Sequence, residues 1–291
     1  MENIKFIIFF LLSFYISFAQ RIPVEYFQKI NLSSSAQIEL KNLENKKNKS
    51  NYDMLRIGEL YAMNRQYHKS YENLELIYNQ MKSNYDFLVL FGSVSGMISS
   101  EVSKSKSIKY IKNMKLSFES AAILKPKSID LKNYLLELYI KLPWFLGRNN
   151  KQALRLINDL KKLSFMEGAL AEGYYNLHKG KDKDALIIFL NSLNKINKCS
   201  STDLNITNNS NYKIAVLSYY LHDNDDKAFC FFENYLNNYV QGDYYPRSFA
   251  IHYLNKINDK NYIDKKIEEI IYNYDEFSRW LKKNQKQNFQ K

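Results

Sequence analysis

The four histidines of this chain are its most versatile residues for chemistry, because a neutral imidazole binds metals and titrates near neutral pH. They are His68, His178, His222 and His252, and they are scattered over separate segments. None stands in an HExxH, CxxC or CxxxH arrangement, the spacings that bring metal ligands together. The sequence therefore predicts no metal site.

Two glycine-containing strings invite comparison with catalytic and phosphate-binding motifs. In Gly92-Ser93-Val94-Ser95-Gly96 the central residue is Val94, where a nucleophile elbow has its serine, and no strand is expected before it. We interpret these glycines as close contacts between helices. Gly180-Lys181 lacks the earlier glycine of a phosphate-binding loop, and Asp182 stands where that loop has Ser or Thr. We expect no catalytic residue, no cofactor and no enzyme. The alternative is an exported helical-repeat enzyme with an unrecognised active site in a cleft.

Cys199 and Cys230 are the two thiols of the chain, and an exported protein could oxidise them. The helical pattern puts Cys199 at the end of one helix and Cys230 near the start of the next, toward opposite ends of an antiparallel pair. At about 1.5 Å per residue their Cα atoms would lie about 15 Å apart, far beyond the roughly 7 Å limit for a disulfide. We therefore expect two free thiols.

The elements that would position any site are helices, and the segment 51–83 has the clearest pattern. Apolar and small residues recur there twice at helical spacing. The first run comprises Met54, Ile57, Gly58 and Tyr61, and the second comprises Tyr67, Ser70, Tyr71, Leu74, Ile77 and Tyr78. Residues 63–66 leave room only for a tight turn, so the two helices are predicted to be antiparallel. Gly58 and Ser70 would then allow a close crossing.

The same spacing recurs downstream. Gly58 precedes Ser70 by twelve residues and Gly173 precedes Ala185 by twelve, and in both copies a large apolar residue follows four positions later. A Gly, an aromatic, a small and a large apolar residue at these spacings resemble the tetratricopeptide repeat, a 34-residue helix-turn-helix unit. The resemblance implies a divergent bacterial, exported member of that family, and a binding scaffold rather than an enzyme.

The repeats are irregular, because their equivalent small positions are unevenly spaced. Intervals of 44, 39, 32 and 43 residues separate Ser70, Met114, Ala153, Ala185 and Ala228. We predict an all-α fold, an α-solenoid of about five irregular hairpins with terminal capping helices, stacked as a right-handed superhelix. An ordinary helical bundle is the alternative. The predicted divisions are 1–19, a signal peptide; 20–50, an N-terminal helix and linker; 51–240, the repeats; and 241–291, the C-terminal capping helices.

The first nineteen residues are typical of a secretory signal peptide. Lys5 precedes an apolar run from Phe6 to Phe18, and Ser17-Phe18-Ala19 offers small residues at the cleavage positions. We expect cleavage before Gln20, a periplasmic or secreted mature protein, and no transmembrane span after cleavage. The alternative is an uncleaved anchor, although the run is short against the roughly 20 residues that span a bilayer.

The chain is basic, with a formal net charge of +12. A basic excess with many aromatics raises nucleic acid as a partner. Against that reading, the lysines are spread among Asp and Glu and no recognition motif is present. We therefore expect no nucleic-acid partner.

A proline-aromatic string, Leu142-Pro143-Trp144-Phe145-Leu146-Gly147-Arg148, stands where the third hairpin needs its turn. We expect Trp144 and Phe145 to fold back as a local plug. The alternative is an exposed anchor for a partner.

The resemblance also implies where a partner would bind, because the first helix of each repeat lines a concave groove. The side chains expected in that groove are Arg56, Glu59, Leu170, Tyr174, Leu177, His178, Lys213, Leu217 and Tyr220. Apolar anchors with charged rims suit a peptide or a helix of another protein. We predict a non-enzymatic adaptor for an envelope protein. In the alternative, the terminal helices fill the groove and the convex face or the Trp144 loop binds.

Overall fold

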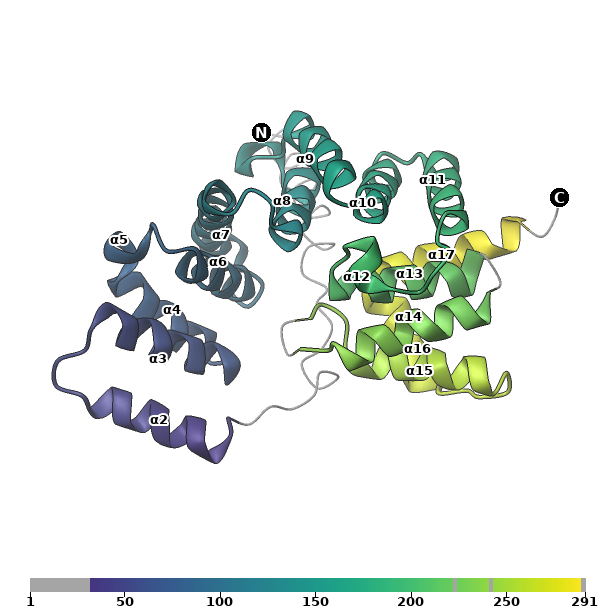
Figure 1. Cartoon of the computed structure of the whole chain (residues 1–291). Coiled ribbons are helices and arrows are strands. Elements are labelled where there is room, and N and C mark those ends of the chain that lie inside the picture. Colours follow the sequence, from purple (N-terminus) through teal and green to yellow (C-terminus); the bar gives the residue numbers. More distant parts are fainter. Residues whose placement is uncertain (1–31, 222–223, 241–242, 289–291) are drawn as a thin grey trace, which may run out of the picture. The chain divides into compact units, whose positions relative to one another are not determined.

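The computed structural model describes residues 32–221, 224–240 and 243–288, and every regular element in these ranges is a helix (Figure 1). The predicted all-α class is therefore confirmed, and neighbouring helices pack in chain order, which is compatible with a solenoid. The expected signal peptide lies outside the described residues. Within them, no helix is both long enough and apolar enough to cross a bilayer.

The chain divides into two compact units, which we call the N-terminal unit, Lys29–Leu156, and the C-terminal unit, Ile157–Lys291. The boundary falls inside one helix, α9 (Asn150–Leu163). A domain of this size that buries its own core is expected to fold as a unit.

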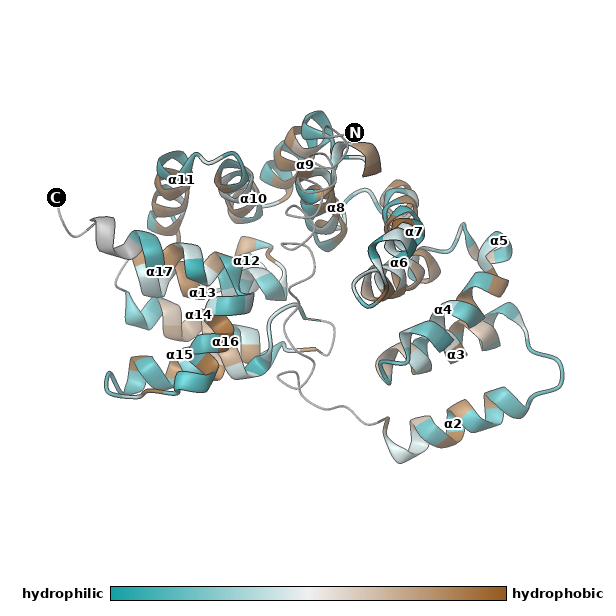
Figure 2. Ribbon diagram, turned by 180° about the vertical axis from the view of Figure 1, so that it is seen from behind, coloured by the Kyte–Doolittle hydropathy of each residue, from teal (hydrophilic) through white to brown (hydrophobic). Residues whose placement is uncertain are grey.

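The N-terminal unit is a series of antiparallel helices. They are α2 (Ser34–Asn45), α3 (Asn51–Met63), α4 (Tyr67–Leu76), α5 (Tyr78–Met81), α6 (Tyr85–Ser99), α7 (Lys104–Leu124), α8 (Ile129–Lys141) and the short 3-10 helix η2 (Trp144–Leu146). Helix α6 packs on α4 and α7, and Figure 2 colours broad stretches of it hydrophobic, whereas α2 is largely hydrophilic. A helix whose surface is apolar on most sides is expected to be covered by other helices on most sides.

Close helix crossings form where the sequence places glycines. The Ser70 hydroxyl donates to the Gly58 carbonyl at 2.7 Å, and a Cβ on Gly58 would lie 2.6 Å from Leu74. In the C-terminal unit, a Cβ on Gly173 would lie 2.2 Å from the ring of Phe189. Real Cβ contacts are not that short, so these crossings require glycine. The predicted close approach at both positions is confirmed.

The C-terminal unit continues the pattern and then returns on itself. Beyond α9 its helices are α10 (Phe165–His178), α11 (Asp182–Asn194), α12 (Ser201–Leu204), α13 (Asn208–Leu221), α14 (Asp225–Asn237), α15 (Arg247–Asn258), α16 (Lys265–Tyr274) and α17 (Glu276–Asn288). Helix α17 packs against α13 (Figure 1). The core is rich in tyrosine: the fully buried Tyr212 ring stacks on Tyr245 at 3.9 Å and meets Tyr235 and Tyr253 edge-on.

Asp275 fixes the start of α17. Its carboxylate accepts from the Ser278 amide at 3.0 Å, from the Ser278 hydroxyl, and from the Tyr212 hydroxyl at 2.9 Å. The first bond caps the helix, and the last ties it to α13. Asp275 is only 1% exposed, and this burial raises the pKa of its carboxyl. The position of α17 therefore rests on a buried polar contact as well as on apolar packing.

The expectation of two free thiols is wrong. Cys199 and Cys230 form a disulfide, with their Cα atoms 6.3 Å apart. Helix α11 ends at Asn194, five residues before Cys199, and the following segment turns back onto α14. Lys227 of α14 holds it there, because its Nζ donates to the carbonyls of Leu193 and Ile196. The 15 Å expectation assumed that the helix continued to Cys199.

The plug expected from Trp144 and Phe145 is also wrong. Trp144 is 83% exposed and Phe145 is 41% exposed, whereas Leu146 is only 5% exposed and fills the core position. Gly147 follows with φ of 109°, a left-handed conformation that favours glycine and closes the turn. Of the three consecutive side chains of η2, Leu146 is the one that is buried.

Candidate functional site

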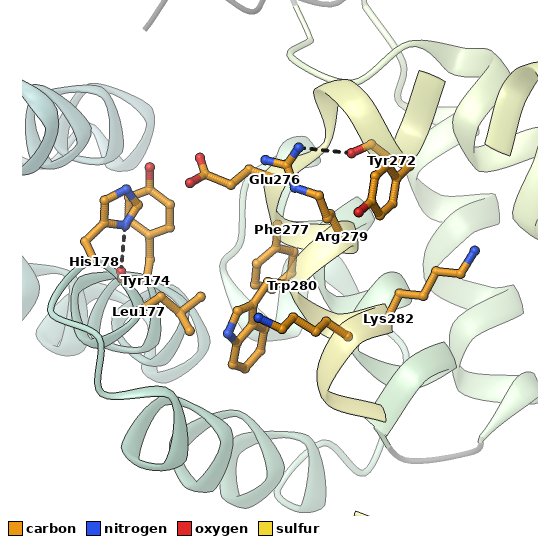
Figure 3. A pocket seen from close by; sticks show the side chains of 10 residues that line it. Tyr174, Leu177, His178, Tyr272, Glu276, Phe277, Arg279, Trp280 and Lys282 are labelled. Carbon is orange, nitrogen blue, oxygen red and sulfur yellow. Dashed lines mark hydrogen bonds between the residues drawn. The ribbon is translucent and has the colours of Figure 1, made fainter. Parts of the chain in front are cut away.

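A cleft of about 690 Å³ opens in the C-terminal unit between α10 and the C-terminal helices (Figure 3). One wall comes from α10 and the other from the end of α16 and from α17. The lining residues are Tyr174, Leu177, His178, Tyr272, Glu276, Phe277, Arg279, Trp280, Lys282 and Lys283. Clefts of this volume are in the range that proteins use for ligands and peptide side chains.

The α10 wall comes from the C-terminal end of that helix. Tyr174, Leu177 and His178 are half-buried there and line the cleft. The Tyr174 and His178 rings are 4.4 Å apart, and His178 Nδ1 lies 3.2 Å from the Tyr174 carbonyl oxygen. This i, i+4 pair gives the wall a fixed aromatic surface.

The α17 wall is held in place by α11. Phe277 and Trp280 are three residues apart on one helix face, and both meet the Phe189 ring edge-on, at 5.6 and 6.0 Å. The Trp280 indole Nε1 is buried and has no hydrogen-bond acceptor among the described residues. In Figure 3 the indole faces Leu177 across the cleft. A buried donor without an acceptor costs free energy, so an acceptor on a bound molecule would relieve that cost.

The rim is predominantly basic. Lys282 and Lys283 are exposed on α17, and Glu276 is the acidic side chain of the lining. Arg279 connects α17 to the end of α16, because its Nη1 donates to the carbonyls of Tyr272 and Asn273. Cations near a helix C-terminus also favour its dipole. The remaining rim charge favours a bound segment that carries carboxylates.

The side chains of the lining that most often act as an acid or a base are a histidine and a glutamate. His178 and Glu276 are its imidazole and its carboxylate, and no Ser, Thr or Cys lies among the described lining residues to act as a nucleophile. The described part of the chain contains no group of three His, Cys, Asp or Glu that would hold a metal ion. His252 has a perturbed pKa, lowered mainly by burial, but it lies in α15 and outside the cleft lining.

The structure brings three of the predicted groove residues together, Tyr174, Leu177 and His178. Leu170 and Leu217 are 5% and 0% exposed, so they belong to the core rather than to an open surface. With the protein in this conformation, a binding partner would not contact the side chains of Leu170 and Leu217.

The remaining predicted groove residues lie elsewhere. The Tyr220 hydroxyl is 3.3 Å from that of Tyr253, and burial raises the pKa of Tyr220; Lys213 is on the same helix, α13. Arg56 is in the N-terminal unit, where its guanidinium donates to Glu39 of α2 at 2.7 and 2.9 Å and to Glu59 at 2.9 Å. Arg56 is therefore engaged by α2, and Glu59 by Arg56 of its own helix.

The α17 wall was not among the expected groove residues, although residues 241–291 were expected to form capping helices. The spacing of four residues in this segment does indicate a helix with one buried face. Phe277, Trp280, Leu281 and Asn284 fall at i, i+3, i+4 and i+7, and three of them are less than a tenth exposed. Such a stripe predicts a helix that packs against its own unit.

Comparison with known proteins adds no assignment. No protein-family model matches the chain, and no curated protein matches it. The resemblance to the tetratricopeptide repeat therefore stays a prediction from spacing.

Proposed function

We propose that this chain is a non-enzymatic helical scaffold that binds an extended segment of another protein in the cleft between α10 and α17. The observation that carries the proposal is the cleft itself, which pairs aromatic walls with a basic rim. Trp, Tyr and Arg are the residues most enriched among binding hot spots.

The polar groups of the cleft suit a peptide. The buried Trp280 indole is a donor without an acceptor among the described residues, and Lys282 and Lys283 place charges at the rim on flexible side chains. A backbone carbonyl would accept from the indole, and carboxylates of the same segment would meet the lysines.

Export of the scaffold to the periplasm or beyond is part of the proposal. The apolar run Phe6–Phe18 with its small-residue cleavage site supports it. The Cys199–Cys230 disulfide supports it independently, because disulfides persist in oxidising compartments and are rare in the cytosol. The partner is then a protein of the cell envelope. N-terminal sequencing of the native protein tests export: a chain that starts at Gln20 supports it, and an intact Met1 contradicts it.

Site-specific photo-cross-linking tests the binding. A photoreactive residue replaces Lys283 at the rim of the cleft, and the control places it at Lys265, an exposed residue at the start of α16. We expect a discrete adduct in intact cells from position 283 that is absent from position 265. Equal adducts from both positions, or none from position 283, would argue against the cleft as the binding site.

A further inference from the structure

The positive charge of the chain is concentrated in one unit. Residues 29–156 contain 21 Lys and Arg against 11 Asp and Glu, a formal charge of +10. Residues 157–291 contain 19 against 17, a formal charge of +2. The N-terminal unit therefore has its own electrostatic preference for an anionic partner.

An exposed aromatic pair lies on this basic unit. Trp144 and Phe145 are adjacent on η2, their rings meet edge-on at 5.9 Å, and Trp144 is the most exposed large apolar side chain among the described residues, at 83%. The turn is rigid, because Pro143 precedes it, Leu146 is buried beneath it and the Gly147 amide donates to the Trp144 carbonyl. The aromatic pair is thus held out from the surface at low conformational-entropy cost.

Cations surround this turn. Lys141 ends α8 just before it, Arg148 and Lys151 are exposed just after it, and the Lys115 side chain of α7 packs against Gly147. Leu116, the next residue on α7, is 54% exposed. Glu119 and Glu137 pair with Lys115 and Lys141, which leaves Arg148 and Lys151 as the excess charge at the turn.

We propose that the N-terminal unit binds the surface of a bilayer that contains anionic phospholipid, with Trp144 and Phe145 inserted at the level of the headgroups. Trp is enriched at the membrane–water interface because its ring is apolar and its N–H polar. Lys and Arg beside such an anchor are attracted to anionic lipid. The two effects together give stable attachment where either alone is weak.

The geometry favours a bilayer over an acidic protein. The aromatic pair protrudes from a turn rather than lining a cleft, so a protein partner would need a matching pocket, whereas headgroups rearrange around the rings. The +10 charge is also distributed along the unit, including Lys106 and Lys112 of α7. A broad, diffuse cation distribution matches a charged surface better than a single acidic segment.

Vesicle binding by the full chain tests this proposal, and tryptophan fluorescence reports the insertion. The chain has two tryptophans, so Trp280→Phe leaves Trp144 as the sole reporter. We expect Trp144 emission to move to shorter wavelength with vesicles of phosphatidylglycerol and phosphatidylcholine, and to stay unchanged with phosphatidylcholine alone. Added salt should weaken the binding.

Two variants and a control separate the anchor from the charge. Trp144→Ala with Phe145→Ala should weaken binding to the anionic vesicles at least about tenfold. Arg148→Glu with Lys151→Glu should weaken binding and reduce its dependence on salt. Ile187→Ala, at a residue that is 57% exposed in the C-terminal unit, should change neither.

Three outcomes would overturn the proposal. The first is equal vesicle binding by the chain with and without the aromatic pair. The second is unchanged Trp144 emission on the anionic vesicles. The third is a shift of that emission with polyglutamate but not with vesicles, which would assign the turn to an acidic protein. Because the cleft lies in the other unit, none of these results bears on the proposed scaffold function.

Discussion

The two units use their aromatic residues in opposite ways. In the C-terminal unit, tyrosines form the core around Tyr212, and Phe277 and Trp280 shape a cleft whose walls are packed from behind. In the N-terminal unit the other tryptophan is on the surface of a turn, and the charge is five times that of its neighbour. Similar helical hairpins thus support two kinds of surface: a concave cleft with a basic rim on a nearly neutral unit, and a protruding aromatic pair on a basic unit.

The units also differ in what holds their outermost helices. Helix α2 is attached to α3 by exposed polar contacts such as that of Arg56 with Glu39, and exposed ion pairs contribute little to stability. Helix α17 is attached through the buried Asp275 and through apolar packing, and a disulfide ties the α11–α12 connection to α14. The contacts in the C-terminal unit therefore hold α17, one wall of the cleft, in a fixed position.

Loss of the disulfide should have the largest effect. Cys199→Ser with Cys230→Ser opens a loop of 31 residues, and loop-closure entropy predicts a loss of about 3–4 kcal/mol from the C-terminal unit. Hydrogen exchange measured peptide by peptide on the full chain checks this, with residues 32–150 as the internal control. Faster exchange should be confined to the C-terminal unit. Unchanged protection there would show that the bond contributes nothing to stability.

Overpacking of a glycine crossing should come next. Gly173→Leu forces a side chain into the Phe189 ring and should cost about 1–3 kcal/mol, with the α10 wall displaced. Gly58→Leu makes the equivalent change against Leu74 in the N-terminal unit, and only Gly173→Leu should also lower cross-linking from position 283. Thermal unfolding compares the two variants. An unchanged melting temperature in both would contradict the close crossings.

The smallest effect is an opposite response to acid at two helix starts. Bonds from Lys46 and Ser50 lower the pKa of Asp53 in α3 to about 2, so its stabilising contribution is present above pH 3.8 and lost as the pH falls through about 2. Burial raises the pKa of Asp275, so folding favours its protonated form. Its contribution is complete below pH 3.8 and is lost as the pH rises through the raised value.

Hydrogen exchange between pH 2 and 5, corrected for the intrinsic chemical rate, reads both helix starts in one sample. On acidification, protection should fall at the first turn of α3 and should hold or rise at the first turn of α17. The same direction of change at both would contradict the assigned environments of Asp53 and Asp275.

Local spacing was sufficient to predict the helices, their antiparallel pairing and the close crossing at Gly58, because each of these depends on residues a few positions apart. It was not sufficient for the disulfide, because the path of residues 195–200 is set by Lys227 and α14 rather than by the segment itself. Sequence periodicity cannot report where a helix stops when no glycine or proline marks the end, as at Asn194.

The candidate site was half predictable for the same reason. Tyr174, Leu177 and His178 share one face of α10 because they fall at i, i+3 and i+4, and they were expected in a groove. Their partners Phe277 and Trp280 come from a helix about 100 residues away, and they reach the same cleft through contacts of α17 with Phe189 and with Tyr212 of α13. The exposure of Trp144 likewise depends on Leu146 taking the one buried position of a three-residue turn.

The most direct test of the central claim compares two neighbouring tyrosines of α10. Tyr174 lines the cleft, whereas Tyr175 is not among its lining residues and has Lys179 over its ring, 5.3 Å from the centroid. The affinity of the partner captured through position 283 is measured for the unaltered chain and for Tyr174→Ala and Tyr175→Ala. We expect Tyr174→Ala to weaken the binding free energy by roughly 2 kcal/mol, which raises Kd about thirtyfold. We expect Tyr175→Ala to leave the binding free energy unchanged. Equal affinities for both variants would contradict binding in the cleft.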